Sequence, residues 1–186
     1  RLAAGLPRPR AILAVSAHWT APAPTVGAAP QPATIHDFYG FPDPLYEIGY
    51  PAPGSPELAA RVTSLIPGVR VDPQRGLDHG AWSPLSLMYP DADIPVCQFA
   101  VMPGADASAH FELGRCLAPL VREGVLVFAS GSLTHNLGEM VPGAPENAAQ
   151  PHVAEFSDWF AARLAANEID ELLDWETRAP HARRAH

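Results

Sequence analysis

The sequence predicts an α/β fold, a single domain in which helices flank a central and mostly parallel sheet. Short apolar runs that are typical of buried strands alternate along the chain with segments of helical periodicity. Strands that alternate with helices form a largely parallel sheet with both faces covered. A length of 186 residues, 47% of them hydrophobic, is sufficient for one such domain with its own core.

Three apolar runs are expected to be strands: Ala11–Val15, Ile94–Val101 and Val125–Ala129. A proline-rich stretch from Ala21 to Pro56 is expected to form a long loop between the first two. Its aromatic residues argue against disorder. Loops longer than about 12 to 15 residues inside compact domains are usually functional when they are ordered.

Two Ser-Pro pairs indicate helix starts. Ser55 is a suitable N-cap with Pro56 at the first helical position. By the same argument, Ser83 and Pro84 are expected to open a short helix that runs through Met88.

Two longer helices follow from hydrophobic periodicity. An amphipathic helix is expected over Ser108–Glu123, with Gly124 as its C-terminal cap. A further helix is expected over Val153–Ala166.

Charge and cysteine content exclude several kinds of partner and site. A net charge of -8 with only 12 Lys and Arg residues disfavours nucleic acid, and no apolar run is long enough to cross a bilayer. Cys97 and Cys116 form no Cys-x-x-Cys pair, so neither a disulfide framework nor a zinc ribbon is indicated. Both are expected to be buried thiols in a reducing compartment, which indicates a cytoplasmic protein. The oligomeric state is left open.

Two histidines that follow strand-like runs are the most informative feature of the chain. His18 follows the first expected strand and His135 follows the third. Ligands of open α/β sheets gather beyond the carboxyl ends of the strands, and neutral imidazole is a common metal ligand. A single histidine at such a place is more often a structural hydrogen-bonding residue, but two at equivalent positions favour a metal or acid/base site.

Two further histidines lie beside acidic residues. His36 precedes Asp37 among aromatic residues that can form a wall over a flat substrate, and an Asx-type turn at Asp37 is an equal alternative. His79 follows Asp78, and a carboxylate next to an imidazole can support a general acid or base. Capping of the following helix is the alternative, but the neighbouring glycines favour a functional role. The remaining histidines are expected at solvated surface or tail positions: His110, His152, His181 and His186.

Six motifs occur in order along most of the chain. They are Ser16–Trp19 (SAHW), Thr34–Phe38 (TIHDF), Tyr50–Pro56 (YPAPGSP), Leu77–Trp82 (LDHGAW), Tyr89–Val96 (YPDADIPV) and Ser130–Leu137 (SGSLTHNL). Through them the chain resembles the class III extradiol ring-cleavage dioxygenases, and within these the 4,5-DOPA dioxygenase-like proteins. Each motif is weak alone, but together they are specific.

This resemblance implies an enzyme with a single non-haem metal at one edge of its sheet. Such enzymes use Fe(II) to bind a catechol through both oxygens, with O2 beside it, and cleave the ring next to the diol; some members contain zinc. By motif, His18 matches a metal-binding histidine, and His135 matches a metal ligand or the acid/base that handles the catechol proton. His79 matches an active-site histidine that assists proton transfer or stabilises bound oxygen, and His36 matches one that lines the pocket.

The chain also departs from the family pattern. The family has a further metal-binding histidine in a His-Gly-Ser-Pro-like segment near the N-terminus and another ligand in a Glu-His segment near the C-terminus. Neither is present, so the catalytic domain, residues 1–186, is expected to be incomplete at both ends and to bind metal poorly by itself. A zinc-binding hydrolase-like protein and a catalytically silent member of the scaffold are the alternatives to an active dioxygenase.

Overall fold

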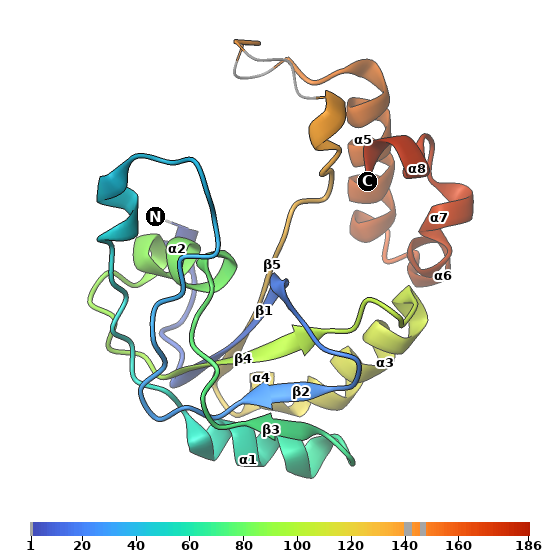
Figure 1. The fold of residues 1–186 in the computed structure, drawn as a ribbon. Coiled ribbons are helices and arrows are strands. Elements are labelled where there is room, and N and C mark those ends of the chain that lie inside the picture. The colour runs from blue at the N-terminus through green and yellow to red at the C-terminus, as the bar shows by residue number, and fades with distance from the viewer. Residues whose placement is uncertain (1, 140–142, 146–147) are drawn as a thin grey trace. The chain divides into compact units, whose positions relative to one another are not determined.

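The computed structural model describes residues 2–139, 143–145 and 148–186, and the chain divides into two compact units. The first unit, Arg1–Gly131, contains the sheet, and the second, Ser132–His186, is helical (Figure 1). Each unit has hydrophobic clusters of its own.

The first unit is built on a five-stranded sheet with the order β3-β2-β4-β1-β5. Its strands are β1 (Ala11–Thr20), β2 (Thr25–Gly27), β3 (Arg70–Asp72), β4 (Val96–Val101) and β5 (Val125–Ser130). All pairings are parallel except that of β2 with β4. The predicted mostly parallel sheet is therefore confirmed. Strands β2 and β3 were not expected, because three residues are too few to show a periodic pattern.

Strand β1 is regular only as far as Ser16. Ser16 pairs with Ala100 of β4, whereas the next paired residue, Thr20, faces Val101. The residues between Ser16 and Thr20 therefore bulge out of the ladder. Bulges often re-aim side chains beside active sites, and this one carries His18.

Four helices cover the two faces of this sheet. They are α1 (Pro56–Leu65), α2 (His79–Met88), α3 (Ala107–Leu117) and α4 (Pro119–Arg122). Leu13 of β1 packs with α1, α3 and α4, whereas its neighbours Ile12 and Ala14 pack with α2 on the opposite face. The alternation of β1 side chains thus divides the core into two clusters. Single turns of 3-10 helix lie at Leu2–Gly5 and Asp43–Tyr46.

Helix α1 begins as the sequence predicts. The Ser55 hydroxyl accepts a hydrogen bond from the Leu58 backbone N–H at 3.2 Å, and Pro56 occupies the first turn. The helix ends at Leu65, before Gly68, whose φ of 82° suits glycine.

The expected start of α2 is wrong by one turn. The helix begins at His79, and Pro84 lies inside it rather than at its start. The cap is Asp78, whose carboxylate accepts a hydrogen bond from the Ala81 N–H at 3.2 Å. This aspartate N-cap starts the helix before the Ser-Pro pair, and it places His79 at the first helical position.

The single helix expected over Ser108–Glu123 is instead two. Helix α3 ends at Leu117 and α4 begins at Pro119, because proline has no N–H to continue the hydrogen-bond ladder. Cys116 on α3 is exposed, so the expectation that both cysteines are buried holds only for Cys97.

The second unit consists of short helices around a small apolar cluster. They are η3 (Leu137–Glu139), α5 (Pro151–Ala165), α6 (Ile169–Leu173), α7 (Trp175–Arg178) and α8 (Ala182–Ala185). Phe156 of α5 is buried against Ala179, Ala182 and Ala185. The predicted α5 is present, with Phe156 buried and Leu164, near its end, 63% exposed.

The α/β class and the flanking helices are thus confirmed. The extent of the domain, residues 1–186 with both ends incomplete, stays a prediction. Among the described residues, no helix is long and apolar enough to span a bilayer.

Leucines on opposite faces of α2 test this packing. Leu85 is fully buried against the sheet, whereas Leu87 is 75% exposed. We expect Leu85→Ala to lower the free energy of unfolding by about 2–5 kcal/mol, because it leaves a cavity, and Leu87→Ala to change it by less than about 0.5 kcal/mol. Urea denaturation of the two variants measures this difference. Equal losses would contradict the orientation of α2.

Candidate active site

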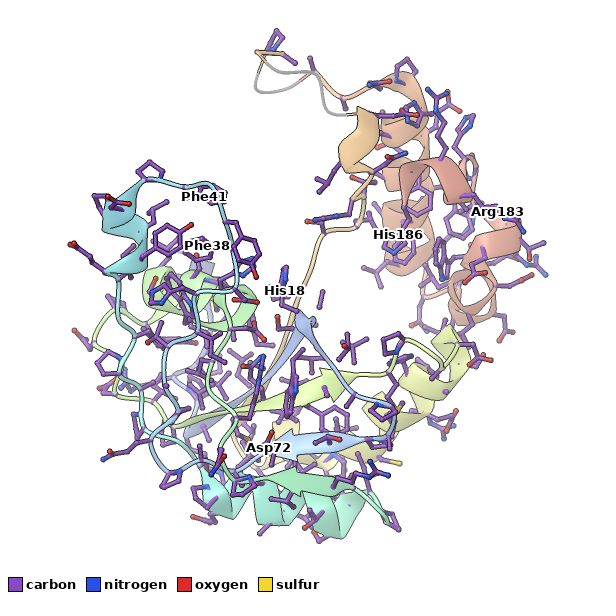
Figure 2. The ribbon with its side chains drawn as sticks, in the orientation of Figure 1. His18, Phe38, Phe41, Asp72, Arg183 and His186 are labelled. Atoms are coloured by element: carbon purple, nitrogen blue, oxygen red, sulfur yellow. The ribbon has the colours of Figure 1, made fainter. Side chains whose placement is uncertain are left out.

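The bulge in β1 exposes His18 at the carboxyl end of the sheet. The His18 backbone N–H donates a hydrogen bond to the hydroxyl of buried Ser16 at 3.2 Å, which holds the bulged backbone. The His18 side chain is 40% exposed. The sequence predicted that His18 follows a strand ending at Val15, but β1 continues to Thr20, and His18 lies in the bulge within it (Figure 2).

A buried polar network fixes the start of α2, which carries His79. The fully buried Asp78 carboxylate accepts hydrogen bonds from the Gln98 side-chain amide at 2.8 Å and from Arg75 at 2.6 Å. The Gln98 side-chain oxygen accepts the Asp78 N–H at 3.0 Å in return. Because Gln98 lies on β4, this network ties the first turn of α2 to the sheet. Asp78 therefore caps and anchors the helix.

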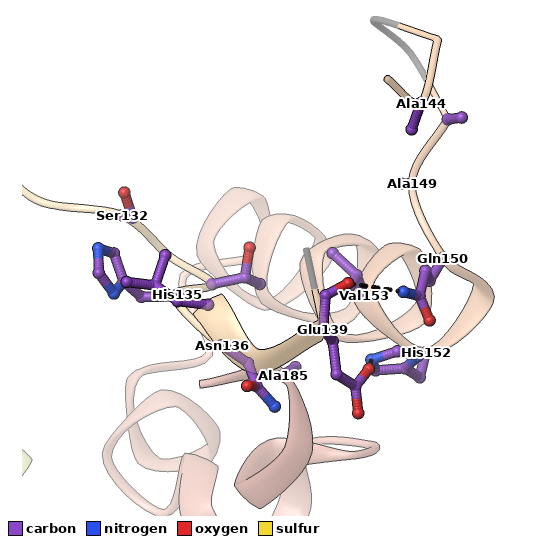
Figure 3. Close-up of a pocket in the computed structure, with 13 residues that line it drawn as sticks. Ser132, His135, Asn136, Glu139, Ala144, Ala149, Gln150, His152, Val153 and Ala185 are labelled. Carbon is purple, nitrogen blue, oxygen red and sulfur yellow. Dashed lines mark hydrogen bonds and ion pairs between the residues drawn. The ribbon is translucent and has the colours of Figure 1, made fainter. Parts of the chain in front are cut away.

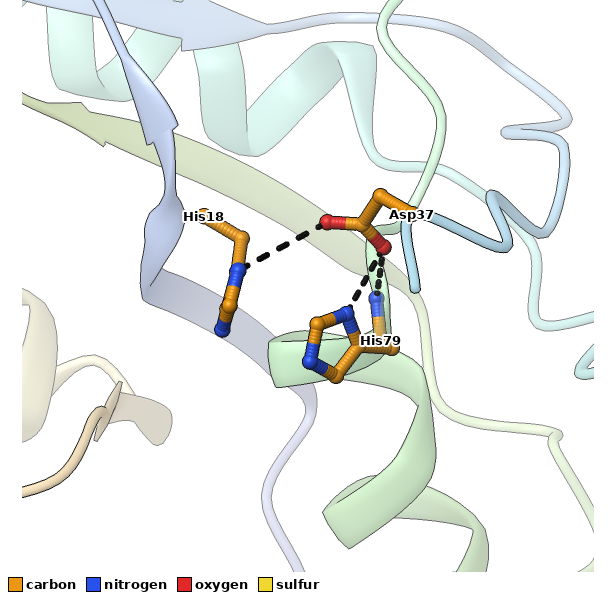
Figure 4. Close-up of side chains that lie close together, drawn as sticks. All are labelled: His18, Asp37 and His79. Carbon is orange, nitrogen blue, oxygen red and sulfur yellow. Dashed lines mark hydrogen bonds and ion pairs between the residues drawn. The ribbon is translucent and has the colours of Figure 1, made fainter. Parts of the chain in front are cut away.

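The carboxylate partner of His79 is Asp37, which comes from the long loop. His79 Nδ1 and the His79 backbone N–H both lie 2.9 Å from the same oxygen, Asp37 Oδ1 (Figure 4). The other oxygen, Asp37 Oδ2, lies 3.8 Å from His18 Nδ1. The two imidazole rings lie side by side, with their centroids 4.0 Å apart and their planes tilted by 48°. The Asp37 carboxylate thus lies between the two histidines, with one oxygen toward each.

This pairing sets the proton positions in the site. Burial raises the pKa of Asp37, but hydrogen bonds from the backbone and ring of His79 outweigh it and hold that pKa below its ordinary value. Asp37 is therefore an anion at neutral pH and can only accept hydrogen bonds. The His79 ring must then donate through Nδ1, which leaves the lone pair on Nε2 free in the neutral ring.

The same three side chains have the donor atoms of a transition-metal site. One ligand atom from each of His18, Asp37 and His79 lies within 4.8 Å of the other two. Two imidazoles and a carboxylate suit Fe(II) or Zn(II). His79 is hydrogen-bonded to a carboxylate, as most metal-binding histidines are. The same hydrogen bond would also orient His79 if it acted as a general base.

Gly80 allows this close arrangement. A Cβ atom at Gly80 would overlap the Ser16 hydroxyl and lie 3.0 Å from the His18 ring. The glycine beside His79 therefore permits the close approach of Ser16 and His18 to α2. Any larger residue would disturb the hydroxyl that holds the backbone of His18.

A cavity of about 320 Å³ lies beside His79, whose side chain forms part of its lining. Most of its wall is aromatic or aliphatic. The apolar lining residues are Phe38, Phe41, Leu45, Ile48, Trp82 and Leu87. Phe38 and Phe41 belong to the same long loop as Asp37 (Figure 2). The cavity is within the size range of small-ligand sites, about 300 to 1,000 Å³.

His36 is located behind this wall. Its Nε2 donates to the backbone carbonyl of Ile48 at 2.9 Å, and its ring packs edge-on against Trp82 with 5.5 Å between centroids. His36 is not among the residues that line the cavity. Its predicted contact with substrate is untested and stays a prediction.

His135 belongs to the second unit, where it lines a cavity of about 710 Å³ (Figure 3). Its backbone N–H donates to the carbonyl of Ala185 at 3.3 Å, and Asn136 donates from its side chain to the carbonyl of Arg184 at 2.8 Å. The side chain of His135 is exposed. The expected shared site of His18 and His135 stays a prediction.

His152 is buried, which corrects the expectation of a solvated position. It is 5% exposed, and its Nε2 lies 2.9 Å from Glu139 Oε2 (Figure 3). Arg184 donates to the other Glu139 oxygen at 2.7 Å, which holds the pKa of Glu139 below its ordinary value. The three side chains connect η3, α5 and α8 within this unit.

The sequence did not reveal that Asp37 pairs with His79. The two residues are 42 positions apart, and the acidic neighbour of each histidine along the chain suggested local pairs instead. In the structure, Asp37 pairs with the distant His79, whereas Asp78 binds Arg75 and Gln98. The one feature of the sequence that could have indicated this role for Asp37 is its place in a long, aromatic-rich loop.

Comparison with known proteins gives a match along the whole chain. A family model described as the catalytic LigB subunit of aromatic ring-opening dioxygenase matches residues 1–186. A 4,5-DOPA dioxygenase extradiol of Beta vulgaris is 46% identical over 184 residues, which cover 96% of this chain and 68% of the relative. One of Escherichia coli K12 is 44% identical over 167 residues, 88% of this chain and 61% of the relative.

A solved structure also matches. The crystal structure of an uncharacterized protein from Escherichia coli K12 superposes with a TM-score of 0.77 at 36% identity. The match covers 95% of this chain and 70% of that chain.

Gly80 provides a test of the site geometry, with Gly114 as its control. A Cβ atom at Gly114, in the middle of α3, would have nothing within 4 Å. We expect Gly80→Ala to destabilise the protein by about 1–3 kcal/mol through overpacking against Ser16, and Gly114→Ala to stabilise it by up to about 1 kcal/mol. Urea denaturation compares the two. A stabilising Gly80→Ala would show that Ser16 and His18 do not approach α2 this closely.

Proposed function

The chain belongs to the LigB family of aromatic ring-opening dioxygenases, and on that basis we propose that it cleaves a catechol-type ring beside the diol with Fe(II) as its metal. Its motifs predicted this family, and the family makes it an extradiol dioxygenase, an enzyme that opens an aromatic ring with O2. The choice of catechol, the use of iron and the roles of single residues are our proposals.

Family membership implies a metal cofactor, and the donor set around His18 fits one. We propose His18 as a metal ligand, because its ring lies at the carboxyl end of the sheet and is partly open to solvent. When bound, a ferrous ion supplies the redox chemistry that lets O2 react with the ring, whereas zinc supplies only Lewis acidity.

His79 is proposed as the acid/base residue. A catechol must lose protons to chelate a metal, and the neutral His79 ring has a free Nε2 lone pair that can take one. The Asp37 anion on Nδ1 stabilises the positive charge that the ring then carries, and it prevents the ring from rotating. The same ring can return the proton when the product forms.

The aromatic wall is proposed to hold the substrate ring. Phe38 packs edge-on against the His79 ring with 5.6 Å between centroids, so an aromatic ring in the cavity would lie beside the proton-accepting atom. Trp82 is fixed by its indole N–H, which donates to the Ile35 carbonyl at 2.8 Å. In this proposal His36 supports substrate binding through Trp82, against which its ring packs.

His135 is proposed to join the metal centre as a ligand or as a second acid/base residue. Its motif, Ser130–Leu137, supports this, and its exposed side chain is free to meet a ligand.

The free thiols of Cys97 and Cys116 agree with a cytoplasmic location.

The observation that carries the proposal is the Asp37–His79 pair beside His18, at the mouth of an apolar cavity. It brings together a metal-binding group, a proton acceptor and room for an aromatic ring. Extradiol chemistry needs each of these three.

Variants of three histidines test these roles. With Fe(II), O2 and catechol, we expect His79→Ala to lower kcat by about 10²–10⁴-fold while the metal content is retained. We expect His18→Ala to lose metal as well as activity. O2 uptake, formation of the yellow ring-opened product and metal analysis measure these effects.

His110→Ala is the matched control, because His110 lies on α3 and bonds to the Met102 N–H rather than to the site. It should retain both metal and activity. Loss of metal in His79→Ala would make His79 a ligand instead of an acid/base residue. Tight zinc with no Fe(II)-dependent O2 uptake would favour a non-redox member of the family.

A further inference from the structure

We infer that Arg75 is a positioning residue that sets the approach of His18 to His79. Its guanidinium links the residue that follows His18 to the cap of the helix that carries His79. The inference rests on the proposed function, in which His18 is a metal ligand, and it assigns a role to a side chain that lies outside the metal-binding group.

Arg75 is joined to the cap of α2. Its Nη2 donates a hydrogen bond to Asp78 Oδ2 at 2.6 Å, and the Asp78 side chain is fully buried. Asp78 accepts the Ala81 N–H and so starts α2, in which His79 is the first residue. The Arg75 side chain is itself only 17% exposed. Charge-assisted hydrogen bonds are shorter and stronger than neutral ones, so the place of the guanidinium is tied to that of the cap.

The same guanidinium lies over the ring of Trp19. Its carbon, Cζ, is 4.8 Å from the ring centroid. Trp19 follows His18 in the bulge of β1 and is buried, whereas the His18 side chain is partly open to solvent. A guanidinium within about 6 Å of an indole is attracted to its face, and the attraction grows when both are shielded from water. Trp19 thus holds one side of His18, and the Ser16 hydroxyl, which accepts the His18 N–H, holds the other.

The backbone that carries Arg75 is also held. Two residues further on, the Leu77 N–H donates to the Ala33 carbonyl, and the Ile35 N–H donates to the Leu77 carbonyl, both at 2.8 Å. A Cβ atom at Gly27 would lie 3.3 Å from the Arg75 Cβ, so this glycine leaves room for the arginine stem against β2. The guanidinium therefore reaches its two partners from a fixed place.

These contacts control a short distance in the site. The His18 and His79 rings have their centroids 4.0 Å apart, one on the bulge and the other on α2 (Figure 4). Without the guanidinium, Asp78 would keep its hydrogen bond from Gln98, but the bulge and the cap would lose the side chain that contacts both. Groups that orient metal ligands typically contribute about 10–100-fold to metal affinity. Arg75 fits that role.

Two measurements on the protein test this link. Calorimetric titration with Co(II), which follows Fe(II) in its affinity for nitrogen and oxygen ligands, gives the metal dissociation constant. In the metal-free protein, the nuclear Overhauser effect between the ring protons of His18 and His79 reports their approach without any metal. Because the rings lie so close, we expect a clear cross-peak.

Variants of the two stacked residues should change both readouts. We expect Arg75→Met and Trp19→Leu each to raise the Co(II) dissociation constant by about 10–100-fold and to weaken the cross-peak. Trp19→Phe keeps an aromatic face for the guanidinium, and we expect its dissociation constant to stay within about threefold of that of the unmodified protein. Unchanged binding and an unchanged cross-peak in Arg75→Met would overturn the inference.

The double variant shows whether Arg75 acts through Trp19. If it does, Arg75→Met combined with Trp19→Leu should bind Co(II) within about twofold of the weaker single variant, because both changes break the same contact. If the two effects multiply instead, the residues act independently and the proposed link is wrong.

Two control variants separate positioning from a general loss of stability. Arg115 pairs with Glu112 across the same spacing of three residues, on the exposed face of α3, and Arg115→Met should leave both readouts unchanged. Leu120 is fully buried in the cluster on the sheet face opposite α2, so Leu120→Ala should destabilise the protein yet keep Co(II) binding and the cross-peak. If Leu120→Ala weakens both as much as Arg75→Met does, the effect is merely structural and the inference fails.

His18→Ala separates this inference from the proposed function. If it binds Co(II) as tightly as the unmodified protein, the proposed metal role of His18 fails, and the cross-peak still decides whether Arg75 sets the approach of the two rings. If His18→Ala loses Co(II) while Arg75→Met keeps both Co(II) and the cross-peak, only the inference fails.

Discussion

The hydrogen bond from His79 to Asp37 is the interaction on which the candidate site depends. It joins the long loop to the first turn of α2, and it leaves His79 with one committed ring nitrogen and one free one. A hydrogen bond to an ionised partner is roughly twice as strong as one between neutral groups. Without it, the loop would still be joined to α2 by the hydrogen bond from the Trp82 indole to the Ile35 carbonyl, but the His79 ring would lose its orientation.

The rest of the first unit holds the two ends of this bond in place. The buried Asp78 and Gln98 attach α2 to β4, and the bulge in β1 brings His18 to the same edge of the sheet. Gly80 lets the helix approach the bulge closely enough for the two imidazole rings to meet. The site therefore needs a strand irregularity, a helix cap and a glycine in addition to its reactive residues.

The sequence predicted those features that have a local signal. Strands β1, β4 and β5, the Ser55 cap of α1 and the placement of His18 near the end of β1 follow from apolar runs and capping chemistry within a few residues. Asp37 with His79, Gln98 with Asp78 and the burial of His152 depend on contacts between distant segments, which local patterns do not encode. The start of α2 was missed because Asp78 and Ser83 are both suitable caps, and only tertiary packing of the first turn selects Asp78.

The tautomer of His79 tests the central claim most directly. Nitrogen-15 NMR of the neutral imidazole ring, in the metal-free protein, distinguishes a proton on Nδ1 from one on Nε2. We expect the proton on Nδ1, because Asp37 accepts it, and we expect Asp37→Ala to remove this preference. A proton on Nε2 in the unmodified protein would contradict the account, since His79 would then have no free Nε2 lone pair to accept a proton from a catechol.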